Sequence, residues 1–314
     1  MPEAGTPSPS SSAAPAPAVV VAPAATVLLL REAASGELEV LMTKRAAGLT
    51  FMGGLWVFPG GRMEQADLAP GLAASTTLDR LERVCHRMLD PEGSTIAAEL
   101  ALGLLVAACR ETFEESGVLL ARPRAAEAAL DDAQLARLAA SREACEDAVG
   151  FVNLLLAENL QLDLDRLVYW SHWITPSLER RRFDTRFFAV RVPPGQEASV
   201  DRCELTQHAW LGEHTVRASV GSGEMKVAPP TLATLEDLWR SHARHGDIDT
   251  MLESERDREV PPILPKMIAT DPAAVEVVLP WDPAYPSLPG EACVVWERYP
   301  GYLSALPSRR TLRR

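Results

Sequence analysis

The most constraining feature of the sequence is one long apolar periodicity that ends in a run of charged residues. Ile96, Leu100, Leu104 and Ala108 recur at four-residue spacing, which predicts a helix over residues 94–116 with Ser94 or Thr95 as its cap. Gly117 follows at the position where a left-handed residue commonly ends a helix. Because this helix has an apolar face to bury, other elements must pack against it, and the hydrophobic content of 47% is sufficient for such a core.

The rest of the chain predicts an α/β fold. Short β-branched, leucine-rich and aromatic runs indicate the strands of a mixed, partly antiparallel sheet, and the turn at residues 34–36 predicts a hairpin. The expected strands are 24–31, 37–43, 56–58, 167–174, 183–192 and 204–211. Further helices are expected within 125–160, from Pro229 to His242 and over 247–256, since proline suits a first helical position.

Composition divides the chain into three parts. Residues 1–22 are rich in Pro, Ala and Ser, and this predicts a disordered tail. Residues 23–258 are expected to form the main domain. Residues 259–314, where prolines recur, are expected to form an extension packed on that domain, with short strands at 275–279 and 293–298.

Charge and cysteine content exclude some classes of protein. A formal charge of −12 argues against a protein that binds DNA or RNA polymers, and the apolar run at residues 19–30 is interrupted by Pro23 and too short to span a membrane. The five cysteines include no closely spaced pair, which indicates a reducing compartment without a zinc ribbon. We expect a cytoplasmic protein.

His172 and His208 are interpreted as ordinary strand residues.

Three glutamates stand at the end of the predicted helix. At 100° per residue, Glu111, Glu114 and Glu115 fall within an arc of about 100°. Like charges this close repel each other, whereas a divalent cation would turn the repulsion into a binding site, and oxygen ligands favour Mg²⁺ or Mn²⁺. Arg110 is placed to orient one carboxylate. Taken alone, such a cluster is also typical of a solvated helix face.

Residues 58–61, Phe-Pro-Gly-Gly, precede this helix, and residues 110–117 read Arg-Glu-Thr-Phe-Glu-Glu-Ser-Gly. Together they resemble the Nudix box of the Nudix hydrolase superfamily. In the uninterrupted family pattern the arginine would stand at position 75, so the box is split by 35 extra residues, an insertion at about 68–102. Asp67 replaces the first glutamate of the family pattern, and Thr112 replaces an aliphatic residue.

Residues 41–46, Leu-Met-Thr-Lys-Arg-Ala, with Gly54 and the Phe-Pro-Gly-Gly segment, resemble the signature of the coenzyme A diphosphatase branch. The long insertion is similar to that of the peroxisomal mammalian type. The branch pattern carries an arginine where this chain has Thr50, so we expect weaker binding of 3′-phosphorylated substrates than in relatives that keep the arginine.

The resemblance implies a Nudix-type α/β/α sandwich with a helical insertion and Pro-rich tails, and a metal-dependent hydrolase that cleaves the pyrophosphate of a nucleoside diphosphate derivative. The expected substrate is coenzyme A or acyl-coenzyme A, and the products are 3′,5′-ADP and phosphopantetheine or its acyl form. ADP-ribose or a dinucleotide is an alternative substrate. A non-catalytic nucleotide-sensing module and an α/β scaffold that binds another protein are alternative functions. The partner is a small nucleotide, with no nucleic-acid polymer and no membrane, and a homodimer is left open.

The resemblance also implies roles for single residues. The catalytic and metal-binding set is Glu111, Glu114, Glu115 and Glu204, with Arg110 as a further catalytic residue. Glu204 is either a metal ligand or general base, or a solvent-facing strand residue. The arginine run at 180–182 is either a phosphate clamp or a solvated edge. The expected substrate-binding residues are Arg45, Gly54, Phe58, Gly60, Gly61 and Arg182.

Overall fold

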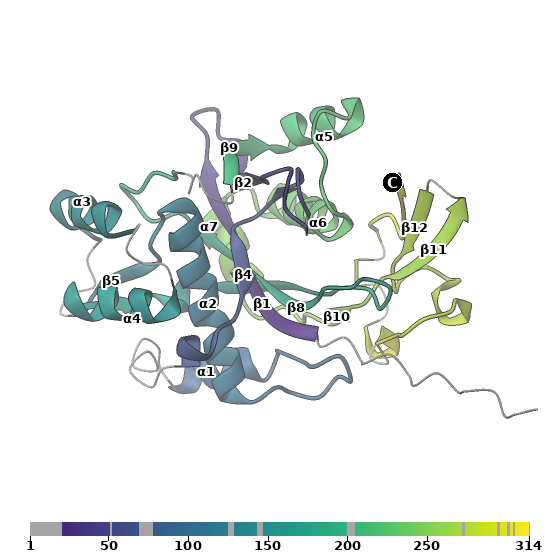
Figure 1. Ribbon diagram of the computed structural model, residues 1–314, viewed down its shortest axis with the longest axis horizontal. Coiled ribbons are helices and arrows are strands. Elements are labelled where there is room, and N and C mark those ends of the chain that lie inside the picture. The colour runs from purple at the N-terminus through teal and green to yellow at the C-terminus, as the bar shows by residue number, and fades with distance from the viewer. Residues whose placement is uncertain are drawn as a thin grey trace, which may run out of the picture.

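The computed structural model describes residues 21–50, 52–68, 78–124, 129–142, 147–199, 205–271, 274–293, 296–299, 302–303 and 305–313. An eight-stranded mixed sheet forms its centre (Figure 1). Six strands follow in the order β10-β7-β8-β1-β2-β3, while β4 pairs with β1 and β9 pairs with β2. The bounds are β1 Val21–Glu32, β2 Leu38–Arg45, β3 Trp56–Val57, β4 Gly60–Arg62, β7 Val168–Ile174, β8 Arg182–Arg191, β9 Leu205–Gly212 and β10 Pro262–Ile263.

The strand directions confirm the predicted mixed sheet. β1 runs parallel to β8, and β10 runs parallel to β7, whereas the other pairs are antiparallel. The expected hairpin joins β1 and β2: the Gly36 N–H donates to the Ala33 carbonyl at 2.9 Å, and Gly36 has φ +83°. The left-handed conformation explains why glycine stands at this turn.

The central strands are buried on both faces, because neighbouring residues contribute to two different cores. In β1, Val27 and Leu29 belong to one hydrophobic cluster, whereas Leu28 and Leu30 belong to the other. This two-residue alternation is the normal consequence of strand geometry. A sheet with two apolar faces requires helices on both of them.

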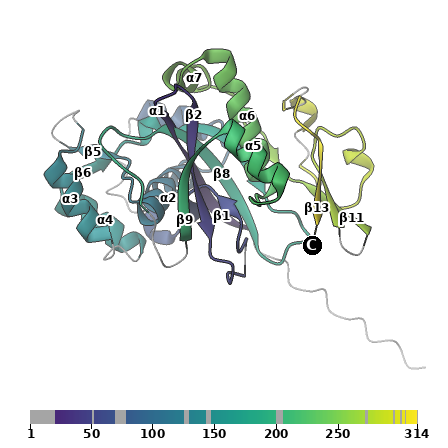
Figure 2. The same ribbon diagram turned by 90° about the horizontal axis from the view of Figure 1, so that it is seen from above.

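The helices cover both faces, as Figure 2 shows from above, and they complete the predicted α/β/α sandwich. Residues of α1 to α4 join the first cluster, and residues of α5 to α7 join the second. No helix in the described ranges is both long enough and apolar enough to cross a bilayer. The bounds are α1 Leu78–Cys85, α2 Ala98–Ser116, α3 Asp132–Ser141, α4 Ala148–Ala157, α5 Glu213–Ser222, α6 Pro229–His245 and α7 Ile248–Ser254.

The insertion differs from expectation. It contains the helix α1, which the sequence did not predict, and α2 begins four residues later than expected, after Ala97 and without a side-chain cap. Asp90 explains the later start. Its N–H donates to the Ser94 carbonyl and its carboxylate accepts the Ser94 N–H, so the expected cap residue closes a turn before the helix.

The two ends of the domain also differ from expectation. β1 begins at Val21, inside the range expected as a tail, because Val21 and Ala22 pair with β8. The expected 259–314 extension supplies β10 to the main sheet and builds a separate antiparallel sheet. Trp296–Arg298, expected as part of a strand, is a short 3-10 helix. The separate sheet comprises β11 Lys266–Asp271, β12 Ala274–Val278 and β13 Arg309–Arg313, and a further strand pair is β5 Ala121–Pro123 with β6 Leu160–Leu162.

His172 is not an ordinary strand residue. It is fully buried in β7, and its Nε2 contacts the Asp184 carboxylate of β8. Arg186 forms an ion pair with Asp184 at 2.6 Å and donates to the Leu89 carbonyl of the insertion at 2.7 Å. This polar cluster therefore connects the sheet to the insertion. Burial, assisted by Arg186, lowers the pKa of His172 to about 4, so the imidazole is neutral at pH 7.

Stability should fall as the pH is lowered from about 6.5 to 4 because of His172. The unfolded chain takes up a proton near the usual value, whereas the folded chain resists protonation until about pH 4, so the unfolded state binds more protons in this window. The expected loss from this residue is about 3 kcal/mol. Urea unfolding of the parent and His172→Gln at several pH values measures it. Equal pH slopes for the two proteins would contradict the prediction.

Candidate active site

The end of α2 is organised by one buried arginine. Arg110 is 1% exposed, and its Nε and Nη2 donate to the two oxygens of Asp67 at 2.9 and 3.0 Å. Its Nη2 also donates to the Arg62 carbonyl at 3.0 Å. The fork geometry of a guanidinium suits this bidentate contact. Arg110 thereby joins α2 to β4 and to the 3-10 helix η1, Gln65–Leu68.

The same guanidinium holds two of the three predicted carboxylates. Arg110 Nη1 donates to Glu111 Oε1 and to Glu114 Oε2, each at 2.9 Å. Burial alone would lower the pKa of Arg110, but its carboxylate partners outweigh burial and raise it. The helix geometry therefore brings Glu111 and Glu114 to one nitrogen, as their spacing suggested.

Burial dominates the charge state of these carboxylates. It raises the pKa of Glu111 above its usual range, against the opposing effect of Arg110. It raises the pKa of Glu114 to about 7. The Glu114 Oε1 atom is buried and has no hydrogen-bond partner among the described residues. A negative charge at this position is therefore only partly compensated by the protein.

Glu115 points toward the Phe-Pro-Gly-Gly segment, where the Gly60 N–H donates to its Oε2 at 2.9 Å. The two glycines are required for different steric reasons. A Cβ on Gly60 would lie 2.5 Å from the Ala25 backbone oxygen, whereas a Cβ on Gly61 would lie 2.4 Å from the Glu111 carboxylate. The segment thus fits closely between β1 and the end of α2.

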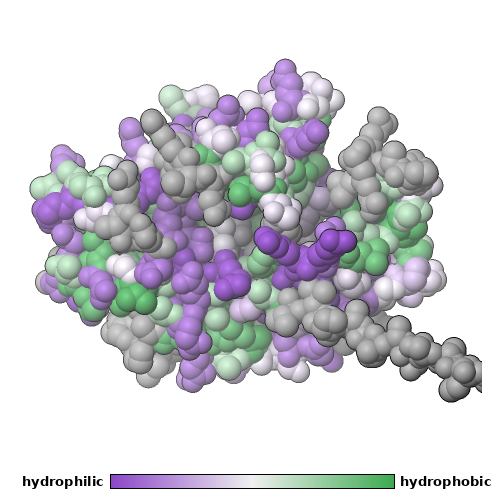
Figure 3. All heavy atoms as spheres, viewed as in Figure 1, coloured by the Kyte–Doolittle hydropathy of each residue, from purple (hydrophilic) through white to green (hydrophobic). Residues whose placement is uncertain are grey.

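Glu111 and Glu115 line a cleft of about 790 Å³. Alternate residues of β1 and the first half of β8 line it, and Pro230 and Thr231 at the start of α6 also contribute. The viewed face carries hydrophilic side chains near its middle, between helices α3 and α4 on one side and the small C-terminal sheet on the other (Figure 3). The lining residues of β1 are Ala22, Ala24 and Thr26, and those of β8 are Arg182, Phe183, Thr185 and Phe187.

The expected substrate-binding residues occupy different positions around this cleft. Arg45, Phe58, Gly60, Gly61 and Arg182 all line it. The buried Phe58 ring packs edge-on against Phe187, with 6.2 Å between centroids.

Gly54 is not in the lining. It closes the turn after β2: it has φ +77°, and its N–H donates to the Arg45 carbonyl at 3.1 Å. Glu204 lies outside the described residues, so its predicted role stays a prediction.

Sequence reasoning missed two contributions. Asp67 was predicted only as a replacement for the first glutamate of the family pattern, yet it is the buried bidentate partner of Arg110. Its position in that pattern is the signal that could have indicated a role in the site. The Arg62 carbonyl could not be found, because a main-chain acceptor leaves no mark in the sequence. Thr50 is exposed and is not part of the cleft lining.

Comparison of the sequence with protein families identifies the family to which this site belongs. A family model described as the NUDT19 Nudix domain matches residues 13–238 of this chain. The chain belongs to the NUDT19 Nudix domain family. Its Nudix box is therefore the segment that places Gly60 and Gly61 against the glutamates of α2.

Relatives of this Nudix chain include acyl-coenzyme A diphosphatase NUDT19 from three vertebrates. The Xenopus laevis protein is 27% identical over 231 residues, which cover 65% of this chain and 60% of that protein. The Homo sapiens protein is 29% identical over 242 residues, covering 64% and 63%. The Gallus gallus protein is 30% identical over 235 residues, covering 62% and 59%. The match spans about three fifths of the length of these curated relatives.

A solved structure is similar to this Nudix chain. The crystal structure of a NUDIX hydrolase from Alicyclobacillus acidocaldarius has a TM-score of 0.52 and 27% sequence identity. The similarity covers 69% of this chain and 90% of that one. It supports assignment of the central sheet and its helices to the Nudix fold.

Alanine at the two glycines of the Nudix box should produce two different defects. Gly61→Ala is expected to lower activity at least about tenfold with little loss of stability, because it displaces the Glu111 side chain. Gly60→Ala is expected to lower the free energy of unfolding by about 1–3 kcal/mol, because it meets rigid backbone. Gly221→Ala, which meets nothing within 4 Å, is the control. Turnover and urea unfolding separate the defects, and equal stability losses at both positions would contradict this assignment.

Proposed function

We propose that this chain is a divalent-metal-dependent hydrolase that cleaves the pyrophosphate bond of a nucleoside diphosphate derivative. The observation that carries the proposal is the juxtaposition of the α2 glutamates with a cleft rich in arginine. Arginines attract a polyanion but cannot deprotonate water, whereas carboxylates can bind cations or accept a proton. A cleft that combines the two groups suits hydrolysis of a phosphoanhydride.

The donor set at the end of α2 fits a divalent cation. Nudix hydrolases generally use divalent metals, and the buried, unpartnered Glu114 Oε1 is an oxygen donor of the type that Mg²⁺ and Mn²⁺ prefer. Among the described residues, no three His, Cys, Asp or Glu side chains form a ready-made cage. Mg²⁺ is usually bound by one or two carboxylates, with water and substrate phosphates completing its shell. We propose Glu111, Glu114 and Glu115 as the protein ligands, with Glu204 as a further one or as the general base.

The chain's own residues would prepare the reaction. Arg110 orients Glu111 and Glu114, and the Gly60 N–H fixes Glu115. Arg45 and Arg62 line the cleft, where their charges would offset those of the substrate. A carboxylate would accept the proton of the water that attacks one phosphorus atom while the other phosphate leaves. A bound divalent ion would neutralise the pyrophosphate and make the water more acidic.

Coenzyme A or acyl-coenzyme A is the substrate that we propose. Three relatives are named acyl-coenzyme A diphosphatases, which supports this class. The products would be 3′,5′-ADP and phosphopantetheine or its acyl form. A reducing, cytoplasmic location is part of the proposal, and Cys85, Cys109 and Cys293 are buried and unpaired.

Incubation of the purified protein with Mg²⁺ or Mn²⁺ and a panel of nucleotides tests the proposal. The panel contains coenzyme A, acyl-coenzyme A, ADP-ribose and NADH, and mass spectrometry identifies the products. We expect 3′,5′-ADP from the coenzyme A substrates, and none when the metal is removed by a chelator. Cleavage of ADP-ribose or NADH alone would overturn the substrate proposal. Binding of a panel member without cleavage of any of them would overturn the proposed activity and favour a nucleotide-sensing module.

A further inference from the structure

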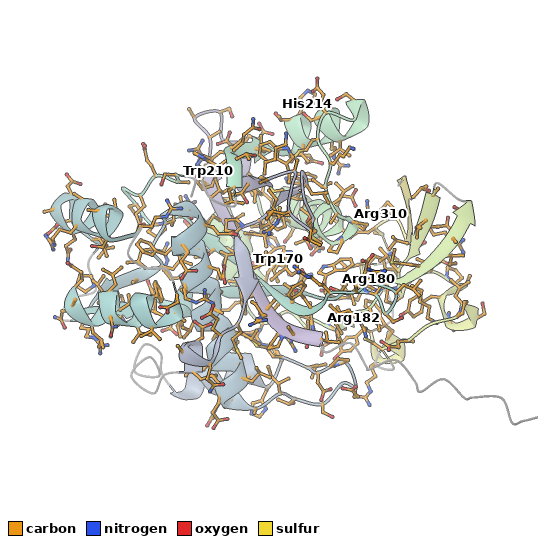
Figure 4. All side chains as sticks on the ribbon, viewed as in Figure 1. Trp170, Arg180, Arg182, Trp210, His214 and Arg310 are labelled. Atoms are coloured by element: carbon orange, nitrogen blue, oxygen red, sulfur yellow. The ribbon has the colours of Figure 1, made fainter. Side chains whose placement is uncertain are left out.

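Three consecutive arginines with unequal surroundings lie at the end of the β7–β8 turn and the first position of β8. Arg182 is buried, and its guanidinium donates to the Glu291 carboxylate at 2.7 Å and to the Thr175 carbonyl at 3.0 Å. Arg180 and Arg181 are exposed, line the same cleft, and have no hydrogen bond or ion pair within the described part of the chain. Figure 4 shows Arg180 and Arg182 beside β8, on the side of the small C-terminal sheet. Two guanidinium groups are therefore available to a ligand.

The charge of the cleft is opposite to that of the protein. The chain carries a formal charge of −12, yet the charged lining comprises five arginines and only two glutamates. The neighbouring acidic residue Glu179 is exposed and does not contribute to the lining. An excess of positive charge in a cleft of an acidic protein favours an anionic ligand.

Strand register separates the two charged ends of the cleft. On β1, Ala25 and Thr26 pair with Gly61 and Gly60, which contact Glu111 and Glu115. Val21 pairs with Arg182, and Arg180 and Arg181 precede it in the turn. Four to five residues of β1 therefore separate the carboxylate end from the arginine end, or about 13–16 Å of strand.

A pyrophosphate, whose two phosphorus atoms share one bridging oxygen, is too short to occupy both ends. If the anhydride lies at the glutamates, as the proposed function requires, a different anionic group must lie at the arginines. We infer that Arg180 and Arg181 bind a phosphomonoester on the nucleoside part of the substrate, separate from the pyrophosphate that is cleaved. This inference rests on the proposed function.

The chemistry of the two arginines suits such a group. A phosphomonoester is close to doubly charged at pH 7 and offers three acceptor oxygens. Paired guanidinium groups can donate to those oxygens in a fork-like manner and remain charged at any physiological pH. Thr50, where the branch pattern carries an arginine, is exposed and lies outside the cleft lining. Substrate selection for the extra phosphate would then depend on the β7–β8 turn.

Binding of two adenine nucleotides without a pyrophosphate tests the inference, because neither can be hydrolysed as a phosphoanhydride. Calorimetry with adenosine 3′,5′-bisphosphate and adenosine 5′-monophosphate in Mg²⁺ gives the affinity ratio that the extra phosphate produces. We expect the bisphosphate to bind the parent protein at least about tenfold more tightly. In Arg180→Gln/Arg181→Gln this ratio should fall to near one, with the monophosphate affinity little changed.

A matched control removes the same number of positive charges elsewhere. Arg137 and Arg244 have side chains 54% and 60% exposed and do not line the cleft. Arg137→Gln/Arg244→Gln should keep the parental ratio, and this would exclude a general effect of net charge. A parental ratio near one, or a ratio retained by Arg180→Gln/Arg181→Gln, would overturn the inference. Hydrolysis of coenzyme A is measured separately. Tighter binding of the bisphosphate without any hydrolysis of coenzyme A would refute the proposed function but support this phosphate site.

Discussion

Glu114→Gln should reduce turnover at least about 100-fold and leave the fold intact. Loss of a group that only supports a metal ligand typically costs 10–100-fold, so loss of a proposed ligand should cost at least as much. The amide keeps the shape of the side chain, and Glu114 is only partly buried, so we expect little change in unfolding. Glu115→Gln should behave similarly, because its carboxylate is held at the cleft by Gly60.

A control on the same helix separates a site effect from a loss of helix charge. Glu99 lies in the first turn of α2 and is exposed, far along the helix from the site. Glu99→Gln should therefore keep parental turnover. Steady-state kinetics over a series of Mg²⁺ concentrations, with circular dichroism as a test of folding, measures all three variants. Undiminished Mg²⁺-dependent hydrolysis in both Glu114→Gln and Glu115→Gln would refute the metal-site proposal.

Arg110→Met should cause the largest loss of stability of any single change at the site. It keeps much of the side-chain volume but leaves the buried Asp67 without its bidentate partner and removes the cation shared by Glu111 and Glu114. Breaking a buried ion pair in this way costs about 3–5 kcal/mol. Urea unfolding measures the loss.

The matching control is Arg137→Met. Arg137 forms an exposed ion pair with Glu158, with a side chain 54% exposed, and such pairs contribute little to stability. If Arg110→Met unfolds at the same urea concentration as Arg137→Met, then Asp67 is not anchored through Arg110 as the hydrogen bonds indicate.

The sequence allowed prediction of those parts of the fold whose signals are local. The apolar runs of the strands, the turn at residues 34–36 and the helix ending at Gly117 all depend on neighbouring residues, and each is confirmed. The predicted start of α2 was wrong. Ser94 was expected to cap the helix, but it forms hydrogen bonds with Asp90 in a turn that precedes the helix. Helix α1 was missed although Leu78, Leu81 and Cys85 recur at helical spacing, because the pattern spans only eight residues.

In the candidate site, too, the contacts within one helix could be predicted from the sequence, whereas contacts between distant segments could not. The meeting of Glu111 and Glu114 follows from helix geometry, and the structure brings both to Arg110. The role of Arg182 depends on Glu291, more than 100 residues later in the chain, and no local pattern reports that pairing. The burial of His172 likewise depends on strands that meet only in the folded sheet.

The short strand β10 has a practical consequence for any shortened version of this protein. It lies beyond the residues matched by the family model, yet it covers the outer edge of β7. A polypeptide ending before Pro262 would present the unpaired backbone groups of β7 to solvent, and such edges promote pairing between molecules. Trimming the chain to its recognisable family segment would therefore favour aggregation, and the smallest well-behaved fragment should extend past Ile263.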